Sequence, residues 1–222
     1  MEKLFSGKVY EVLPLSNGII FSYCKSELDI GDYVEYKMIS FDNRRITSVA
    51  KNIYLLSKFG NNSKEIKKYC NNFIETKAIL LPSGKVFLLG IDGTAQLIDN
   101  DGTPVWQGSL SYRAYSPSDI VLHNNALWAS YSECNALLRY NLNTMREELR
   151  IGGNKSPFDK PVSLFVAGDC VTVCNLGSQK LVQVNLNTYS VLEYQTFEEP
   201  VYQYVQSGDY RFAVLQSGLY LI

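Results

Sequence analysis

The chain has 222 residues, of which 46% are hydrophobic and 19% charged, a composition that favours an ordered domain with a substantial core and excludes a disordered protein. Its 21 Lys and Arg residues balance 22 Asp and Glu residues, so the net charge of −1 lacks the basic surplus expected of a protein that binds nucleic acid or an anionic membrane. The 16 Tyr and 10 Phe residues favour β-strands, whose pleated surface accommodates aromatic side chains.

Residues 8–57 are predicted to form a first group of short strands. A Ser-Asn-Gly turn at 16–18 is followed by GIIFSYC, DYVEYKMISF and RRITSVAKN, all rich in β-branched and aromatic residues. The strand pattern is then interrupted at residues 58–76. Within that segment, NNSKEIKKYCNNF at 61–73 begins with Asn62 three residues before Glu65, as in a capping box, and its apolar residues recur at helical spacing. We expect a short helical insertion there.

Three complete groups of four short segments follow, in residues 77–110, 117–152 and 160–197. The turn after the first segment of each group recurs at steps of 41, 44 and 40 residues, counted from Ser83 to Gly208. The letters repeat as well, since LRYNLNT at 138–144 returns as VQVNLNT at 182–188. A period near 40 residues with four strands in each repeat is typical of β-propeller blades, which bury both faces only against their neighbours.

The last repeat is incomplete, because residues 199–222 supply only three segments. The missing outer segment has a counterpart at the N-terminus, where FSGKVYEVLPLSNG from Phe5 aligns with FEEPVYQYVQSG from Phe197. We therefore predict that residues 1–6 complete the last blade, since an unpaired strand would leave an exposed edge. The expected fold is an all-β, five-bladed propeller of four-stranded antiparallel blades, in one domain, with a helical insertion between the first two blades.

One alternative fold and the number of blades stay open on these grounds. A β-sandwich also shows short strands and frequent turns, although it gives no reason for four-strand groups at equal spacing. The number five depends on treating residues 58–76 as an insertion.

Residues 84–108, GKVFLLGIDGTAQLIDNDGTPVWQG, resemble the quinoprotein-like propeller repeat, in which an outer-strand Trp docks onto the neighbouring blade. That resemblance assigns this role to Trp106, and it covers one blade, because the other blades lack the Trp. The third and fourth blades are similar to the generic repeats of bacterial YVTN and NHL-type propellers. The blade number resembles that of five-bladed lectins and glycosidases. These resemblances imply a fold rather than an activity.

The chain offers few residues for familiar catalytic or metal chemistry. His123 is its one histidine, so paired-histidine zinc sites are absent; it could act as the sole imidazole base, but its place beside an Asn-Asn turn favours a structural role. Cys170 and Cys174 lie four apart on a predicted strand, about 13 Å along it, which is too far for a disulfide or a shared metal. Phosphate-binding glycine loops and a G-x-S-x-G elbow are also missing.

The sequence DNDGT at 99–103 has two interpretations. Asp99 and Asp101 suggest a calcium loop, but Leu97 occupies the position where that loop needs another oxygen ligand. A hairpin turn with Gly102 at positive φ explains the same residues, and we favour it. We expect no metal and no cofactor.

Ligands usually meet a propeller on the face that carries the loops between blades and the loops of each blade's second hairpin. The candidate ligand-binding residues in such loops are Asp29, Asp32, Tyr112, Arg113, Tyr115, Glu133, Lys155, Phe158 and Asp159. Tyrosines and cations together suit stacking and charge-assisted contacts, although the tyrosines could equally cap the apolar ring.

The function predicted from these features is that of a non-catalytic binding or scaffold propeller that recognises a protein or a small polar ligand. The alternative is a carbohydrate-binding lectin or a glycosidase-like enzyme, with acidic loop residues near the axis. An N-terminus without signal-peptide character, no apolar run of membrane-spanning length and five scattered cysteines favour a cytoplasmic monomer without nucleic-acid or membrane partners.

Overall fold

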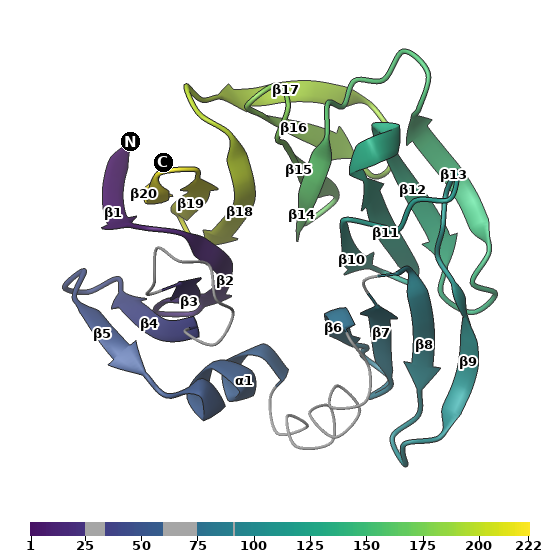
Figure 1. Cartoon of the computed structure of the whole chain (residues 1–222), viewed down its shortest axis with the longest axis horizontal. Coiled ribbons are helices and arrows are strands. Elements are labelled where there is room, and N and C mark those ends of the chain that lie inside the picture. The colour runs from purple at the N-terminus through teal and green to yellow at the C-terminus, as the bar shows by residue number, and fades with distance from the viewer. Residues whose placement is uncertain (25–33, 60–74, 91) are drawn as a thin grey trace.

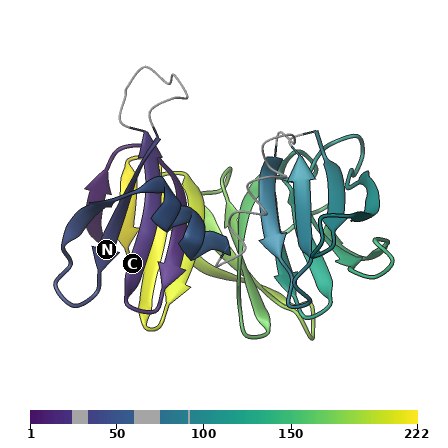
Figure 2. The ribbon, with the colours of Figure 1, turned by 90° about the horizontal axis from the view of Figure 1, so that it is seen from below.

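The computed structural model describes residues 1–24, 34–59, 75–90 and 92–222. Five four-stranded antiparallel sheets are arranged around a central axis, each with its first strand nearest the axis (Figure 1). Viewed from the side, the sheets stand next to one another like the blades of a propeller (Figure 2). The predicted five-bladed propeller is therefore confirmed.

Each blade follows the chain from the axis to the rim. Blade 1 consists of β2 (Val9–Leu15), β3 (Gly18–Cys24), β4 (Val34–Ser40) and β5 (Ile46–Val49); blade 2 of β6 (Glu75–Leu80), β7 (Val86–Gly90), β8 (Thr94–Ile98) and β9 (Pro104–Ser109); blade 3 of β10 (Asp119–His123), β11 (Ala126–Tyr131), β12 (Ala136–Asn141) and β13 (Glu147–Gly152); blade 4 of β14 (Pro161–Ala167), β15 (Cys170–Asn175), β16 (Lys180–Asn185) and β17 (Val191–Thr196); and blade 5 of β18 (Val201–Ser207), β19 (Tyr210–Leu215), β20 (Gly218–Leu221) and β1 (Glu2–Ser6).

The strand sequences follow from this layering. Every residue of β7 and β11 is buried, because neighbouring blades cover both faces of a second strand, and these strands are accordingly continuous apolar runs such as VFLLG. The outermost strands β9 and β13 are mostly exposed or half-buried and carry polar residues. Apolar clusters fill the interfaces between blades 2 and 3, 3 and 4, 4 and 5, and 5 and 1.

The last blade is closed by the N-terminal strand. β1 pairs antiparallel with β20, and Glu2 lies opposite Leu221 and Ser6 opposite Gly218. Gly218 has φ 144°, and a Cβ there would collide with the carbonyl oxygen of Phe5, so the close approach of the two strands requires glycine. The Phe5 ring packs against Phe21 of blade 1, with centroids 5.0 Å apart.

The single α-helix in the described residues, α1 (Lys51–Phe59), connects the first two blades. It starts earlier than the predicted insertion at 58–76, and the expected helical segment 61–73 lies outside the described residues. Phe59 joins the apolar cluster of blade 2, whereas the Tyr54 ring packs on Tyr36 of blade 1 at 4.6 Å. The helix thus contacts both blade 1 and blade 2.

The repeated NLNT letters form a hairpin turn. In blade 3 the Oδ1 of Asn141 accepts hydrogen bonds from the backbone N–H of Asn143 at 2.9 Å and of Thr144 at 3.2 Å, and Met145 follows at φ 52°. The same arrangement recurs in blade 4 at Asn185, Asn187, Thr188 and Tyr189. An Asn that bonds its own turn explains why both blades spell this turn alike.

Alkaline pH is expected to weaken the interface between blades 5 and 1. Tyr23 is buried there against Phe5 and donates a hydrogen bond to Glu35, and burial, followed by this bond, raises the pKa of Tyr23 to about 12. Because the folded pKa exceeds the unfolded value of about 10, the stabilisation is complete below pH 10 and is lost as the pH rises to 12. The free energy of unfolding, measured in urea, should fall less between pH 9 and pH 12 for Tyr23→Phe than for the wild type. Equal losses in both proteins would contradict this assignment.

Candidate functional site

One repeat position places a polar side chain next to the axis in every blade. The five residues are Glu11, Lys77, Asp119, Ser163 and Gln203. Each lies near the start of its first strand, and the residue that follows it is buried. Alternation along a strand therefore turns the preceding polar side chain to the opposite face of its sheet. We call these five residues the axial ring.

Asp119 is the most strongly bound member of the axial ring. Its side chain is 10% exposed and forms an ion pair with Lys77 of blade 2. Its Oδ2 accepts hydrogen bonds from the backbone N–H of Leu164 at 2.8 Å and from the Ser163 hydroxyl at 3.2 Å, and its Oδ1 accepts one from the N–H of Ile120. One carboxylate thus connects blades 2, 3 and 4.

Gln203 connects blade 5 to blade 1 in a related way. Its Oε1 accepts a hydrogen bond from the N–H of Val12 at 2.7 Å, and its Nε2 donates one to the Val12 carbonyl at 3.2 Å. Gln203 and Asp119 therefore both bind the backbone of the residue that follows the ring position in the next blade. A polar ring of this kind ties the inner strands together.

Glu11 completes the axial ring by binding α1. Its carboxylate accepts a hydrogen bond from the Tyr54 hydroxyl and pairs with Lys58, whose Nζ lies 2.9 Å from each carboxylate oxygen. Burial, followed by the charge of Glu11, raises the pKa of Tyr54, so that the phenol stays protonated. The helix supplies here the contacts that a neighbouring blade supplies elsewhere.

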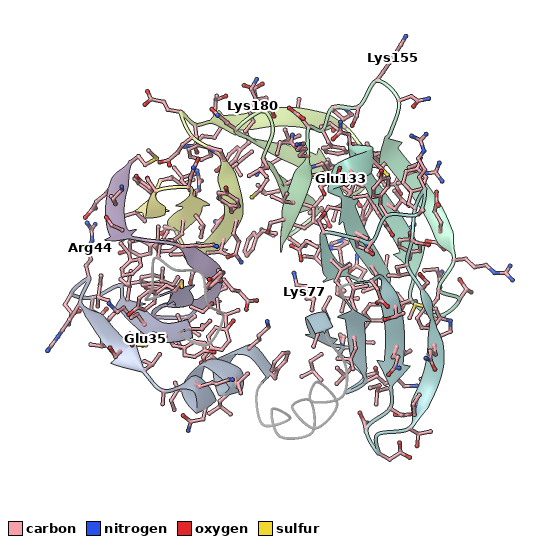
Figure 3. All side chains as sticks on the ribbon, in the orientation of Figure 1. Glu35, Arg44, Lys77, Glu133, Lys155 and Lys180 are labelled. Carbon is pink, nitrogen blue, oxygen red and sulfur yellow. The ribbon has the colours of Figure 1, made fainter. Side chains whose placement is uncertain are left out.

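The axial ring lines a pocket of about 610 Å³. Its walls also include Tyr10, Ser22, Val34, Lys58, Leu89, Ser118, Val162 and Tyr202. All five blades and α1 contribute, and Lys77 points toward the middle of the ring (Figure 3). Tyr10 and Tyr202 are 45% and 44% exposed. The lining combines two lysines and two carboxylates with two accessible aromatic rings.

The comparisons with known proteins extend only to the fold. Virginiamycin B lyase from Staphylococcus aureus superimposes with a TM-score of 0.55 at 14% identity, and the match covers 95% of this chain and 64% of the lyase. The computationally designed Ika4 protein gives 0.54 at 11% identity over 68% and 91% of the two chains, and Sqt1 from Saccharomyces cerevisiae gives 0.55 at 12% identity over 96% and 71%. No family model and no curated protein matches the chain. The chain is similar to β-propellers in fold.

The residues predicted for ligand binding lie away from this pocket where the structure describes them, whereas Asp29 and Asp32 lie outside the described residues. Tyr112, Arg113 and Tyr115 belong to the connection between blades 2 and 3. Tyr112 is buried and Tyr115 is 49% exposed. Two guanidinium groups flank the Tyr112 ring, Arg113 at 5.2 Å and Arg150 at 4.2 Å. This group is a local cluster on blade 3.

The other four predicted residues are not brought together as a site. Lys155 lies at the outer tip of its loop (Figure 3). Phe158 is 3% exposed and belongs to the apolar cluster between blades 3 and 4. Glu133, in the 3-10 helix Ser132–Cys134, and Asp159 are both exposed.

Other features of the sequence have a structural explanation. DNDGT is the turn between β8 and β9, where Gly102 has φ 90° and the Asp101 carboxylate accepts a hydrogen bond from the N–H of Thr103, so the hairpin interpretation is confirmed. Trp106 packs on the cluster shared by blades 2 and 3 and stacks on Phe87 of its own blade. Cys174 is buried, and burial raises the pKa of its thiol.

The described residues contain neither a candidate metal cluster nor a candidate membrane-spanning helix. No group of three or more His, Cys, Asp or Glu residues in this part of the chain could hold a metal ion. No helix among the same residues has the length and apolar character to cross a bilayer.

Proposed function

We propose that this chain is a binding propeller that recognises a small polar ligand in the axial pocket. The observation that carries the proposal is the convergence of side chains from all five blades, several of them polar, on one cavity of about 610 Å³. A cavity of this size is in the range of small-molecule sites. The axial ring supplies convergent donors and acceptors that suit hydrogen bonds in several directions.

The balance of charges favours a ligand with hydroxyl groups or with charges of both signs. Lys58 and Lys77 offset Glu11 and Asp119, so the lining has no surplus of either sign. The exposed rings of Tyr10 and Tyr202 offer flat apolar surfaces beside these groups. Carbohydrates combine hydroxyl groups with apolar ring faces, and a lectin-type ligand is therefore the first class to test.

Catalysis by paired carboxylates is the second candidate function, and the presence of Glu11 and Asp119 in one pocket motivates it. Binding has the stronger support, because both oxygens of Asp119 already accept hydrogen bonds from the protein and both oxygens of Glu11 face Lys58. We further propose a cytoplasmic monomer that needs no cofactor and has no nucleic-acid or membrane partner. We also propose that the blades of this chain are related to YVTN, NHL-type or quinoprotein-like repeats.

The test is calorimetric titration with methyl glycosides and free amino acids, in the wild type and in two tyrosine variants. Tyr202→Ala removes an exposed ring from the pocket and should weaken binding about threefold to tenfold, the usual effect of one aromatic contact. Tyr115→Ala removes a similarly exposed ring from the connection between blades 2 and 3 and should leave affinity unchanged.

The opposite pattern, with Tyr115→Ala weakening binding and Tyr202→Ala without effect, would place recognition on the inter-blade loops instead. Glycosidase activity is tested separately with nitrophenyl glycosides. Turnover that Glu11→Gln and Asp119→Asn both abolish, in folded protein, would replace the binding proposal by the enzymatic one.

A further inference from the structure

A second pocket lies between blades 3 and 4. The first strand of blade 3 has the axial ring at its start, and the pocket lies at its opposite end. Its volume is about 270 Å³, and it is lined by His123, Asn124, Trp128, Arg139, Leu186, Asn187 and Tyr189. It shares no lining residue with the axial pocket. His123 is the last residue of β10, whereas Asp119 of the axial ring is the first.

The equivalent place between blades 2 and 3 is filled with apolar side chains. Trp128 and Arg139 are paired across strands β11 and β12, and the residues paired at the same position of blade 2 are Phe87 and Leu97. Phe87 and Leu97 pack in one apolar cluster with Leu81, Leu142 and Met145. In that interface the NLNT turn of blade 3 closes against blade 2.

The equivalent place between blades 5 and 1 is filled as well. Its cross-strand pair is Phe212 and Leu221, and Phe41 of blade 1 stacks on Phe212 with ring centroids 5.9 Å apart. The cavity that remains beside these residues measures about 10 Å³. Two of the repeated interfaces are thus closed by the same kind of packing.

The interface between blades 3 and 4 departs from this packing at three repeat positions. Arg139 stands where blade 2 has Leu97, and His123 stands where blade 2 has Leu81. Tyr189 stands where blade 3 has Met145, and it is 40% exposed while Met145 is 9% exposed. Polar or partly exposed residues therefore occupy three positions that carry apolar residues in the interface between blades 2 and 3. The pocket between blades 3 and 4 results from this difference.

The chemistry of the lining points to an anion with an apolar body. No carboxylate lines the pocket, and Arg139 is its permanent cation. Arg139 pairs through Nη1 with Glu148 at 2.9 Å, which leaves other guanidinium donors for a planar acceptor. Asp169 is 62% exposed, and its carboxylate lies 3.8 Å from Nε2 of His123. Neither of these two acidic neighbours, Glu148 and Asp169, lines the pocket.

The remaining walls suit a flat ring. Trp128 is 1% exposed and the Tyr189 ring lies 6.4 Å from it, tilted by 46°. The volume is below the range of roughly 300–1,000 Å³ that is typical of drug-sized ligands, so the occupant must be small. We propose that this pocket binds a small aromatic carboxylate, whose carboxylate meets Arg139 and the amides of Asn124 and Asn187 and whose ring meets Tyr189, the exposed aromatic side chain of the lining.

The experiment is titration of the protein with benzoate, followed by calorimetry or by ligand-observed NMR, with acetate and inorganic phosphate as comparison anions. Two variants copy the closed interface between blades 2 and 3: Arg139→Leu removes the cation, and Tyr189→Met should fill the opening. Each should weaken benzoate binding at least tenfold. Arg146→Leu removes an exposed arginine outside the pocket and should leave benzoate binding unchanged.

The outcomes separate this pocket from the axial one, because Tyr202→Ala should not affect benzoate. Circular dichroism of both pocket variants checks that they fold, and Tyr189→Met should be at least as stable as the wild type. The proposal is overturned if the wild type does not bind benzoate at millimolar concentration, if both pocket variants bind it as the wild type does, or if acetate or phosphate binds as tightly as benzoate.

Discussion

Deleting residues 2–6 is expected to lower the free energy of unfolding by roughly 3 kcal/mol or more and the melting temperature by on the order of 10 °C. The deletion removes β1, leaves β20 as an unpaired edge and uncovers the apolar surface beneath Leu4 and Phe5. Urea unfolding and a thermal melt measure the loss. Phe5→Ala, which keeps the strand but removes its ring from Phe21, should give an intermediate value.

The matched control is Glu2→Gln in the same strand. Glu2 pairs with Arg44 at 2.6 Å, but both side chains are more than half exposed, and such pairs contribute at most about 1 kcal/mol. A deletion variant that melts within a degree or two of Glu2→Gln would contradict the closure of blade 5 by β1.

Asp119→Ala is expected to cost about 3–5 kcal/mol of stability, the range measured when one partner of a buried ion pair is removed. The substitution leaves Lys77 without its carboxylate and the N–H groups of Ile120 and Leu164 without their acceptor. Since the side chain joins three blades, the loss should appear as one cooperative transition at lower urea concentration.

Two further variants separate the charge from the hydrogen bonds. Lys77→Met removes only the ion pair and should cost less, because Asp119 keeps the donors of Ser163 and of the backbone. Asp42→Ala removes an exposed carboxylate and should stay within about 0.5 kcal/mol of the wild type. If Asp119→Ala is no more harmful than Asp42→Ala, the axial ring does not hold the inner strands together.

The architecture could be predicted because a propeller repeats its physical constraints. Each blade needs a buried second strand and a turn of fixed form, so the period near 40 residues and the NLNT turns are visible in the sequence. The closure of the ring was visible too, because the segment around Phe5 aligns with the one around Phe197 and both occupy the outer-strand end of a blade.

Helix α1 was not predicted, for a physical reason, whereas the segment predicted to be helical, 61–73, lies outside the described residues. Residues 51–59 contain few apolar positions that face inward, since Tyr54 and Phe59 are buried while Ile53 and Leu56 are exposed. Their pattern is therefore weak, and it depends on two different blades that the local sequence does not reveal.

The axial ring was missed although the repeat alignment contains it. Long loops with aromatic and charged residues, such as those of Tyr112 and Lys155, were predicted to bind a ligand, whereas the pocket is lined mainly by residues near the starts of the inner strands. The available signal was a polar residue before a buried apolar one at the same repeat position, such as Glu11, Lys77 and Asp119. One copy of this pattern is no different from the start of an ordinary strand. The pattern becomes visible only when all five repeats are aligned.

The register of β1 against β20 also determines how the domain responds to mechanical force. Glu2 lies opposite Leu221, so a pull applied through these two residues acts on the same end of an antiparallel ladder. Such loading separates the pairs one after another rather than shearing them all at once. Tension would therefore peel blade 5 open from its rim at low force, while the contacts of the inner strands stayed intact until later.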